Sequence, residues 1–331
     1  MRYFGSKVST LDILYGHISS RVPTGSFCDP FGGIGSVGSY FQARGYEVWS
    51  GDILKFPHFF QIARLKFSPL FFEKLLAHLG LSSHFDLICY MNSITPKNGW
   101  FVKEYAINRM FFTVRNAMQI QSCRLQIQKW AKLSLITYEE HAVLLASLIN
   151  SMDKVANTAG TYYAFLKTLY RKAENAFKFE LIQPLPFESK GFCFNEPAES
   201  LVSRKHFDVL YLDPPYNQRS YSHYYHLPET IAQEKTPIVH GMSGIPKLIS
   251  CVSGFNSPRE AKKSLTNVID SAKFNLLVFH YADDGIIPEK EVKDLLSSYG
   301  NVEDFLIDSK GYTTIRNHRK QEHHLYLVQD A

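Results

Sequence analysis

The chain has 331 residues, 45% of them hydrophobic, which exceeds the ~100–200 residues of a usual single domain and predicts one large domain with an insertion or two domains. The net charge of +5 permits a polyanionic partner. However, the isoelectric point of about 8.7 lies below the ~9 that marks a strongly basic nucleic-acid binder, so charge alone does not indicate one.

No apolar run approaches the ~18 residues of a membrane-spanning helix, and residues 1–5 carry no apolar signal segment. We therefore expect a soluble, cytoplasmic protein that has no membrane segment. The five cysteines are scattered and form no C-x-x-C pair, which favours reduced thiols and argues against a zinc site. We expect no metal.

A glycine-rich turn follows the first predicted strand. The predicted elements here are a helix over 8–20, a strand over 26–28 and a helix over 34–44. Gly33, Gly35 and Gly38 fit the G-x-G-x-x-G pattern of a dinucleotide site, and glycines let a ligand approach the backbone closely. However, Asp29 just before the turn would repel a pyrophosphate and could hold an ammonium group. A methionine-bearing cofactor therefore fits better than a dinucleotide.

The next predicted strand, over 46–50, ends at Gly51-Asp52. Asp52 lies at about the ~20-residue spacing at which a carboxylate accepts from ribose hydroxyls in such units. An ordinary Gly-Asp turn is the alternative.

The middle of the chain reads mainly as helical. Helices are predicted over 58–66 and 69–79, and the pattern is helical again from about 103 to 175. Residues 84–93 echo the strand at 206–214, which could suggest a duplicated unit or a rival site at Asn92. However, this copy lacks the later Pro-Pro-Tyr and strands of this type recur by chance, so we expect neither. The cations of the helical block could contact phosphates or simply solvate exposed faces: Arg109, Arg115, Arg124, Lys129, Lys132, Lys154, Lys167, Arg171 and Lys172.

Asp213-Pro214-Pro215-Tyr216 ends an apolar strand predicted over 207–212; earlier strands are predicted over 178–182 and 191–194. A carboxylate, a fixed turn and an aromatic ring suit a planar ring that carries an amino group. The amino nitrogen of such a ring, for example in a nucleobase, is a poor nucleophile because its lone pair is delocalised. The Asp213 carboxylate and the Pro214 carbonyl could draw it toward tetrahedral geometry, while Tyr216 stacks on the base. Read alone, the tetrapeptide could equally be a plain turn.

Beyond this turn, residues 217–258 are loop-rich and could form a lid or a DNA-contact loop. Strands are predicted over 274–280, 302–307 and 323–328, and a helix over 288–298. His323 and His324 should point to opposite faces of the last strand, which argues against joint metal ligation.

Three motifs, in this order, resemble those of the Dam-like (alpha-group) adenine-specific DNA methyltransferases, in the branch found in type II and type IIS restriction-modification systems. They are Arg2 to Lys7, Asp29 to Gly35 and Asp213 to Tyr221. The resemblance implies a Rossmann-like α/β sheet with helices on both faces and a helical insertion. It also implies S-adenosylmethionine as methyl donor. By this resemblance the cofactor-binding residues are Tyr3, Gly5, Lys7, Asp29, Phe31, Gly33, Gly35 and Asp52. The catalytic residues are Asp213, Pro214, Pro215 and Tyr216. The residues expected to contact the substrate are Asn217, Arg219 and Tyr221.

The chain departs from the family pattern at two places. Pro197-Ala198 replaces the usual Asp-Ala pair, so Glu196 becomes the candidate for the cofactor's adenine contact, with a surface turn as the alternative. Phe279-His280-Tyr281 replaces the usual Ser-Tyr-Asn. Neither change touches the catalytic tetrapeptide.

The resemblance implies a site-specific enzyme that methylates the N6-amino group of a flipped adenine in duplex DNA. It further implies a catalytic domain over 1–100 and 176–331, and a helical insertion over 101–175 that recognises the DNA target. We expect a monomer, and a cognate restriction endonuclease is a candidate partner. The alternatives are a related methyltransferase acting on RNA or a protein amide, or a catalytically silent DNA-binding relative.

Overall fold

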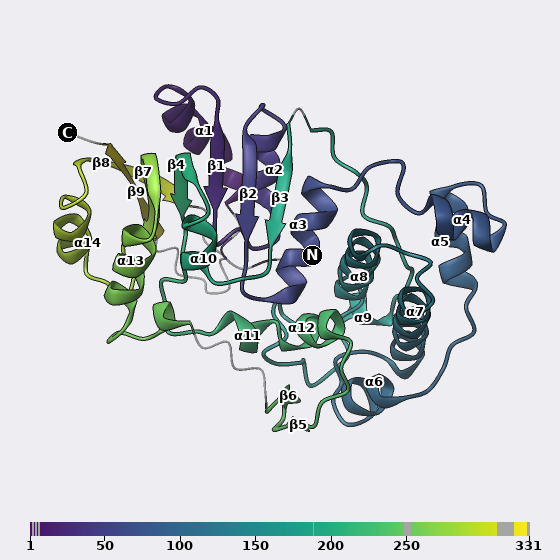
Figure 1. The fold of residues 1–331 in the computed structure, drawn as a ribbon. Helices are drawn as coiled ribbons and strands as arrows, with labels where there is room; N and C mark the ends of the chain where they lie inside the picture. Colours follow the sequence, from purple (N-terminus) through teal and green to yellow (C-terminus); the bar gives the residue numbers. More distant parts are fainter. Residues whose placement is uncertain are drawn as a thin grey trace. The chain divides into compact units, whose positions relative to one another are not determined.

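The computed structural model describes residues 1, 3, 5, 7–187, 189–247, 253–309 and 321–329, which form two units (Figure 1). The sheet unit comprises Gly5–Ile53, Pro186–Ser220 and Val252–Ala331. The helical unit comprises Met1–Phe4, Leu54–Leu185 and Tyr221–Cys251. This division differs from the predicted boundaries, because residues 54–100, 176–185 and 221–251 join the helices rather than the sheet.

A seven-stranded sheet, ordered β3-β2-β1-β4-β7-β9-β8, organises the described part of the sheet unit. Its strands are β1 (Ser26–Asp29), β2 (Glu47–Gly51), β3 (Gly191–Phe194), β4 (His206–Leu212), β7 (Lys273–Ala282), β8 (Asn301–Ser309) and β9 (Gln321–Gln329). The first five in spatial order are parallel, and β9 runs antiparallel between β7 and β8. The strand order reverses between β1 and β4, where open α/β sheets bind their ligands. The predicted Rossmann-like α/β sheet is confirmed.

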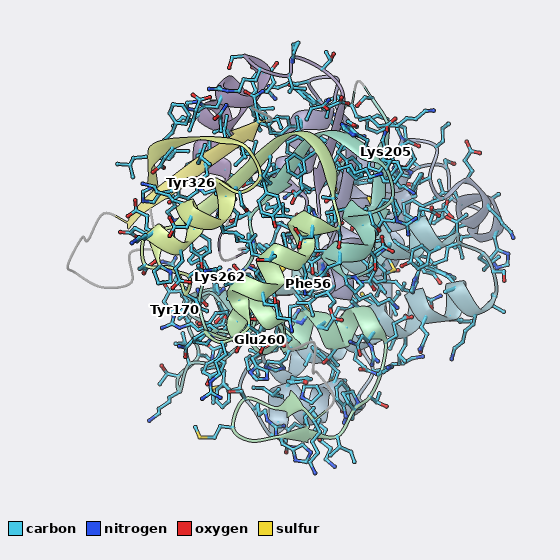
Figure 2. The ribbon with its side chains drawn as sticks, turned by 60° about the vertical axis from the view of Figure 1, so that its left-hand side comes forward. Phe56, Tyr170, Lys205, Glu260, Lys262 and Tyr326 are labelled. Carbon is cyan, nitrogen blue, oxygen red and sulfur yellow. The ribbon has the colours of Figure 1, made fainter. Side chains whose placement is uncertain are left out.

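Helices cover both faces of this sheet, as predicted (Figure 1). The helical elements of this unit are η1 (Val8–Thr10), α1 (Leu11–Ser19), α2 (Ser36–Gln42), α10 (Ala198–Val202), η3 (Gly254–Asn256), α13 (Ala261–Asp270) and α14 (Glu289–Leu296). On one face Phe41 of α2 stacks on Phe27 of β1, with ring centroids 4.2 Å apart. On the other face α10, α13 and α14 share a core with Phe279 and Tyr326. Lys262 of α13 and Tyr326 of β9, both labelled in Figure 2, lie on this second face of the sheet. Lys262 pairs there with Glu291 of α14 at 3.0 Å.

The helical unit is built around α3 (Lys55–Leu65), α7 (Val114–Lys132) and α8 (Tyr138–Asp153). The remaining elements are α4 (Glu73–Leu79), α5 (His84–Ser93), α6 (Trp100–Val102), the π-helix η2 (Lys103–Ile107), α9 (Arg171–Glu174), α11 (Tyr221–Tyr224), α12 (His226–Gln233), β5 (Val239–His240) and β6 (Ile245–Pro246). A capping box joins Thr137 and Glu140 at the start of α8, whose apolar residues are buried almost throughout. Glu229 of α12 accepts from the backbone N–H groups of Lys55 and Phe56, which begin α3.

Residues 84–93 form helix α5, so they do not repeat the strand at 206–212 that their sequence echoes. Ser83 caps the helix by accepting from the Asp86 backbone N–H, and Leu87 and Met91 are buried one turn apart. Asn92 instead exchanges hydrogen bonds with the backbone of Phe179.

Two further segments differ from their predicted structure for the same kind of reason. Residues 178–182 belong to no sheet, because backbone N–H groups there bind side chains of the helices: Glu180 binds Ser151 and Ile182 binds Ser147. Residues 162–170 are not helical. There the Asn157 side chain takes up three backbone groups, those of Met110, Leu166 and Tyr170.

Candidate functional site

The glycine-rich turn and the Asp-Pro-Pro-Tyr turn meet at one edge of the sheet. β1 and β4 are adjacent and parallel, with Cys28 opposite Leu210, so both strands end at the same edge. Asp29 ends β1, and Asp213 follows β4 directly. The two carboxylates lie within electrostatic reach, since the charge of Asp213 raises the pKa of Asp29. The topology thus brings together the two motifs that the sequence analysis predicted to form one site.

Asp29 is an unusual buried acid. Its side chain is 2% exposed, and among the described residues its Oδ1 has no hydrogen-bond partner. Burial, then the charge of Asp213, raises the pKa of Asp29 well above its usual value, although the Phe31 backbone N–H opposes this increase. Gly33 and Gly35 follow at φ angles of 50° and 78°, which favour glycine. A carboxylate oxygen left without a donor beside such a turn fits the ammonium group of the expected cofactor.

Asp52 and Glu196 lie on neighbouring loops at the ends of β2 and β3. The Asn195 side chain donates to the backbone oxygens of Asp52 and Ile53, at 2.9 and 3.0 Å, and so joins the two loops. The Glu196 carboxylate forms a two-pronged ion pair with Arg204, with both N–O distances 2.8 Å. The cofactor roles of Asp52 and Glu196 stay predictions, and any ligand would have to share Glu196 with Arg204.

Lys7 and Asp213 form a buried ion pair. Lys7 Nζ lies 2.9 Å from Asp213 Oδ1, and the two side chains are 6% and 16% exposed. Burial raises the pKa of Asp213, while the charge and hydrogen bond of Lys7 oppose this increase. Lys7 also lies 5.8 Å from the centroid of the Tyr216 ring. Lys7 therefore contacts both functional side chains of the catalytic turn.

Tyr216 is buried at the end of the turn, and 8% of its surface is exposed. Its ring meets the edges of Tyr281 and His323, with centroid distances of 6.1 and 5.8 Å. Its backbone oxygen accepts from Ile286 at 3.0 Å. Burial raises the pKa of the Tyr216 hydroxyl, so this group stays protonated at neutral pH. Pro214 is buried beside it, and Pro215 is partly buried.

The residues after the tetrapeptide divide between the two units. The Asn256 side chain donates to the backbone oxygens of Asn217 and Arg219, at 2.7 and 3.2 Å, which fixes this turn in the sheet unit. Tyr221 begins α11 in the helical unit and contacts Tyr3, with a centroid distance of 5.8 Å. Tyr3 also stacks on Tyr225 at 5.2 Å.

The predicted N-terminal cofactor motif is therefore split: Tyr3 packs in the helical unit, whereas Gly5 and Lys7 belong to the sheet unit. Gly5 has a φ of 78°, a conformation that favours glycine. The other motif residues, Arg2, Phe4 and Ser6, lie outside the described residues.

Two histidines that were not predicted as site residues lie beside this site, His280 of β7 and His323 of β9. Tyr211 Oη lies 3.1 Å from His280 Nδ1, and the His280 and His323 rings are 5.3 Å apart. The substitution of the family's Ser-Tyr-Asn at 279–281 was the available signal for His280. His323 gave no signal, because its contacts depend on the antiparallel register of β7 and β9.

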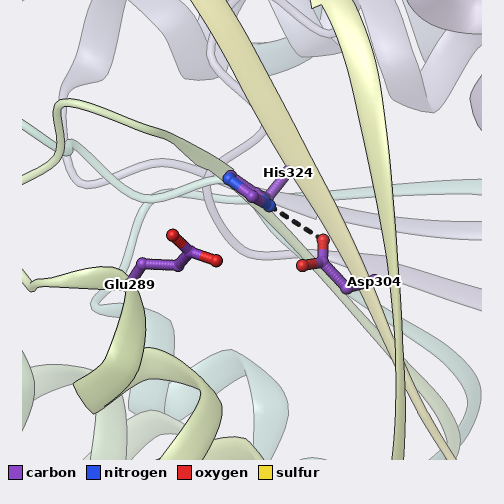
Figure 3. A group of neighbouring side chains, drawn as sticks. All are labelled: Glu289, Asp304 and His324. Carbon is purple, nitrogen blue, oxygen red and sulfur yellow. Dashed lines mark hydrogen bonds and ion pairs between the residues drawn. The ribbon is translucent and has the colours of Figure 1, made fainter.

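His324 points away from His323, as predicted, and joins Glu289 and Asp304 in a group of possible metal ligands (Figure 3). His324 Nδ1 lies 2.8 Å from Asp304, and its ring stacks on Tyr326. Lys293 already pairs with both acids, at 2.6 Å to Glu289 and 2.9 Å to Asp304. A lysine ammonium thus compensates these carboxylates, so the group carries no metal assignment.

Two arginines of the helical block make internal bonds. Arg109 pairs with Glu104 at 2.7 Å and donates to the backbone oxygen of Gly241 at 3.1 Å. Arg124 is 3% exposed and donates to the backbone oxygen of Lys235. These two side chains stabilise the helical unit itself.

A membrane-spanning helix needs a long apolar stretch, and none of the helices among the described residues has one.

Comparisons with known proteins agree with the motifs. Residues 3–295 match the family model of the D12 class N6 adenine-specific DNA methyltransferases. The chain is similar to the type II methyltransferase M.FokI of Planomicrobium okeanokoites, with 31% identity over 97% of this chain and 50% of the relative. It is similar to the modification methylase LlaI of Lactococcus lactis subsp. lactis, with 31% identity over 97% of this chain and 53% of the relative.

The chain thus spans about half the length of these two relatives. It is also 27% identical to the type II methyltransferase M.NlaIII of Neisseria lactamica, over 99% of this chain and 98% of that relative. Among solved structures, magnesium protoporphyrin IX methyltransferase from Synechocystis PCC 6803 is 9% identical, with a TM-score of 0.35 over 97% of this chain and 79% of that one. That similarity is too weak to support a conclusion.

Proposed function

Because the chain belongs to the D12 class N6 adenine-specific DNA methyltransferases, we propose that it transfers a methyl group to the exocyclic N6-amino group of adenine in duplex DNA. The observation that carries this proposal is the pairing of Asp213 with Lys7 beside the open carboxylate oxygen of Asp29. Asp213 is held ready to accept from an amino group, and Asp29 Oδ1 has no hydrogen-bond partner within the described part of the chain. A substrate amine and a cofactor ammonium are the groups that these two acids would bind.

The residues of the catalytic turn have separable tasks. Lys7 holds Asp213 Oδ1 and favours the ionised carboxylate, which leaves Oδ2 to accept from the adenine amino group. The Pro214 carbonyl offers a second acceptor, so the amino nitrogen is drawn toward tetrahedral geometry. Tyr216 stacks on the base, a contact of about 1–3 kcal/mol. The base must leave the duplex first, at a cost of a few kcal/mol.

S-adenosylmethionine supplies the electrophilic methyl group when it is bound. Asp29 would hold the ammonium end of this cofactor, and the turn at Gly33 and Gly35 would let it approach the backbone. Asp52 would accept from the ribose hydroxyls, and Glu196 would contact the adenine ring. Positioning of the two reactants supplies most of the rate.

We further propose that the helical unit carries target recognition and that residues 217–258 contribute DNA contacts. The predicted insertion at 101–175 lies within this unit. Asn217, Arg219 and Tyr221 would contact DNA close to the flipped base. Phosphate contacts would come from cations other than Arg109 and Arg124, which are engaged internally.

Incubation with labelled S-adenosylmethionine and unmethylated duplex DNA, RNA or a protein extract tests the substrate class. We expect label in DNA from the wild type and none from the Asp213→Ala variant, which should still bind the cofactor in calorimetry. Label in RNA or protein alone would support the alternative methyltransferase. Cofactor binding without any transfer would support the silent DNA-binding relative.

The curated relatives are type II methyltransferases and modification methylases, so we propose a role in restriction-modification with a cognate endonuclease as partner. Methylated plasmid DNA should resist an endonuclease that cuts at the target sequence. A plasmid that carries the modification but is cut by every endonuclease tested at that sequence would indicate a solitary enzyme.

A further inference from the structure

Two fully buried histidines lie against the catalytic turn on two neighbouring strands. His280 is 1% exposed and His323 is 3% exposed. His280 pairs with Leu325 of β9 and His323 with Ala282 of β7, so the two histidines are diagonal neighbours, and their rings meet edge to face at 5.3 Å. The His323 ring also meets the edge of the Tyr216 ring at 5.8 Å. A continuous row of rings therefore links Tyr211 to Tyr216.

Both histidines have a ring nitrogen that is left open. Tyr211 takes up Nδ1 of His280, but within the described part of the chain His280 Nε2 and His323 Nδ1 are buried without a partner. Buried polar groups are rarely left unpaired, and such exceptions call for a functional explanation. A neutral imidazole offers one nitrogen as donor and the other as acceptor.

The charge of Lys7 acts on both rings. Burial, then the charge of Lys7, lowers the pKa of His280 well below its usual range. The same two causes lower the pKa of His323 to about 4, with Asp284 opposing and His324 adding to the decrease. Tyr211 and Tyr216 complete the titratable surroundings. At neutral pH both rings beside Lys7 are therefore uncharged.

We propose that His280 and His323 are positioning residues for the catalytic turn. As uncharged rings beside Lys7 and Tyr216, they leave Asp213 as the anion that attracts the Lys7 ammonium. They also hold the Tyr216 ring edge-on. A charged histidine here would compete with Lys7 for Asp213 and would repel the Lys7 ammonium. An apolar ring would pack against Tyr216 but would offer Lys7 no polar atom. The role thus requires a side chain that is polar and uncharged.

Substitution of each histidine by Asn, which is polar and uncharged, or by Phe, which is apolar, tests this role. This test rests on the proposed function, so the rate is measured as a single turnover of methyl transfer to duplex DNA. We expect about a 10- to 100-fold loss for His323→Phe and His280→Phe, and a smaller loss for the Asn variants. The affinity for S-adenosylmethionine should stay within about 2-fold. His206→Asn, at the exposed start of β4, is the matched control.

Phe variants that transfer methyl groups as fast as the wild type would overturn the proposal, because packing alone would then suffice. Asn variants that lose cofactor binding together with activity would also overturn it, because the role would then be purely structural.

A second measurement depends neither on activity nor on the folding of these variants. In the Lys7→Met variant, NMR titration of labelled histidines should show the pKa of His323 rising above about 4 toward its ordinary value, because the nearby cation has been removed. An unchanged His323 pKa would contradict the proposed arrangement. If the wild type fails to methylate DNA, the proposed function fails, while this titration still tests whether the two rings face Lys7.

Discussion

At the scale of single residues, the site depends on three charged groups that burial alone would disfavour. Asp29 and Asp213 are both acids at the edge of a parallel sheet, and burial raises the pKa of each. Lys7 compensates one of them directly, whereas Asp29 keeps an oxygen without a donor among the described residues. Buried charge of this kind is typical of functional sites, because it is costly to maintain.

Replacing Lys7 by Met should slow methyl transfer by about 100-fold, because Asp213 would lose the cation that orients it. The pKa of Asp213 is already raised by burial, and without Lys7 it should rise further. The acid limb of the rate profile should therefore move to higher pH. Rate measurements across pH check this, with Lys7→Arg as the control that retains the charge. An unshifted profile for Lys7→Met would mean that Lys7 does not govern the ionisation of Asp213.

Replacing Asp29 by Asn should weaken binding of S-adenosylmethionine by about 10- to 150-fold, the loss of one charge-assisted hydrogen bond. It should also raise the free energy of unfolding by about 1–2 kcal/mol at neutral pH, since a buried unpaired charge disappears.

The raised pKa of Asp29 makes the stability difference between the wild type and Asp29→Asn depend on pH. The folded-state pKa of Asp29 is raised, so between its ordinary and raised values the folded protein binds more protons than the unfolded protein. The wild type should therefore lose stability relative to Asp29→Asn as pH rises through this window. Calorimetry on the cofactor-free protein measures both effects. Equal stability of the two proteins at pH 5 and pH 8 would argue against a buried ionised Asp29.

The sequence predicted Asp29, Asp213 and Tyr216 as site residues, because each lies at or just after the end of a predicted strand and carries a group that the proposed chemistry requires. The Lys7 ion pair, the Arg204 partner of Glu196 and the His280–His323 contact were not predictable. Each depends on which side chains the fold brings together, and local spacing carries no such information.

At the scale of elements, the errors share one cause: side chains capture backbone groups. Ser83 caps a helix where the echo of residues 206–214 suggested a strand, and Asn157 holds an irregular loop where periodicity predicted a helix. Residues 178–182 have the composition of a strand, but side chains of α8 take the hydrogen bonds that a ladder would use. Strands β1, β4 and β7 were predicted well and are mostly buried, and apolar runs in buried strands leave few alternatives.

Two side chains of the helical unit bind the β5–β6 hairpin. Arg109 donates to the backbone oxygen of Gly241, and Tyr105 donates to that of Gly244 at 3.1 Å. Ile238 and Met242 are 78% and 82% exposed, so little apolar packing holds the hairpin.

Arg109→Met should therefore raise amide hydrogen exchange at residues 239–246 by about 10-fold while α7 and α8 keep their protection. Lys103→Met, which changes an exposed lysine of η2, is the matched control. Unchanged exchange in Arg109→Met would show that the guanidinium does not anchor the hairpin.

At the scale of the whole molecule, the order of motifs along the chain predicted the α/β sheet and the site at its edge. Strands β1 and β4 had to be neighbours for the two turns to meet, and the observed order places them so. The boundaries of the helical unit were not predictable, because residues 54–100 and 221–251 join it through contacts between distant parts of the chain. The family match over residues 3–295 confirms the resemblance drawn from the three motifs.

The most direct test of the proposed chemistry is nucleoside analysis by mass spectrometry of unmethylated duplex DNA after incubation with S-adenosylmethionine and either the wild type or Asp213→Ala. We predict N6-methyl-2′-deoxyadenosine from the wild type only. DNA without any methylated adenine, or equal methylation by the Asp213→Ala variant, would contradict the assignment of Asp213 to adenine methylation.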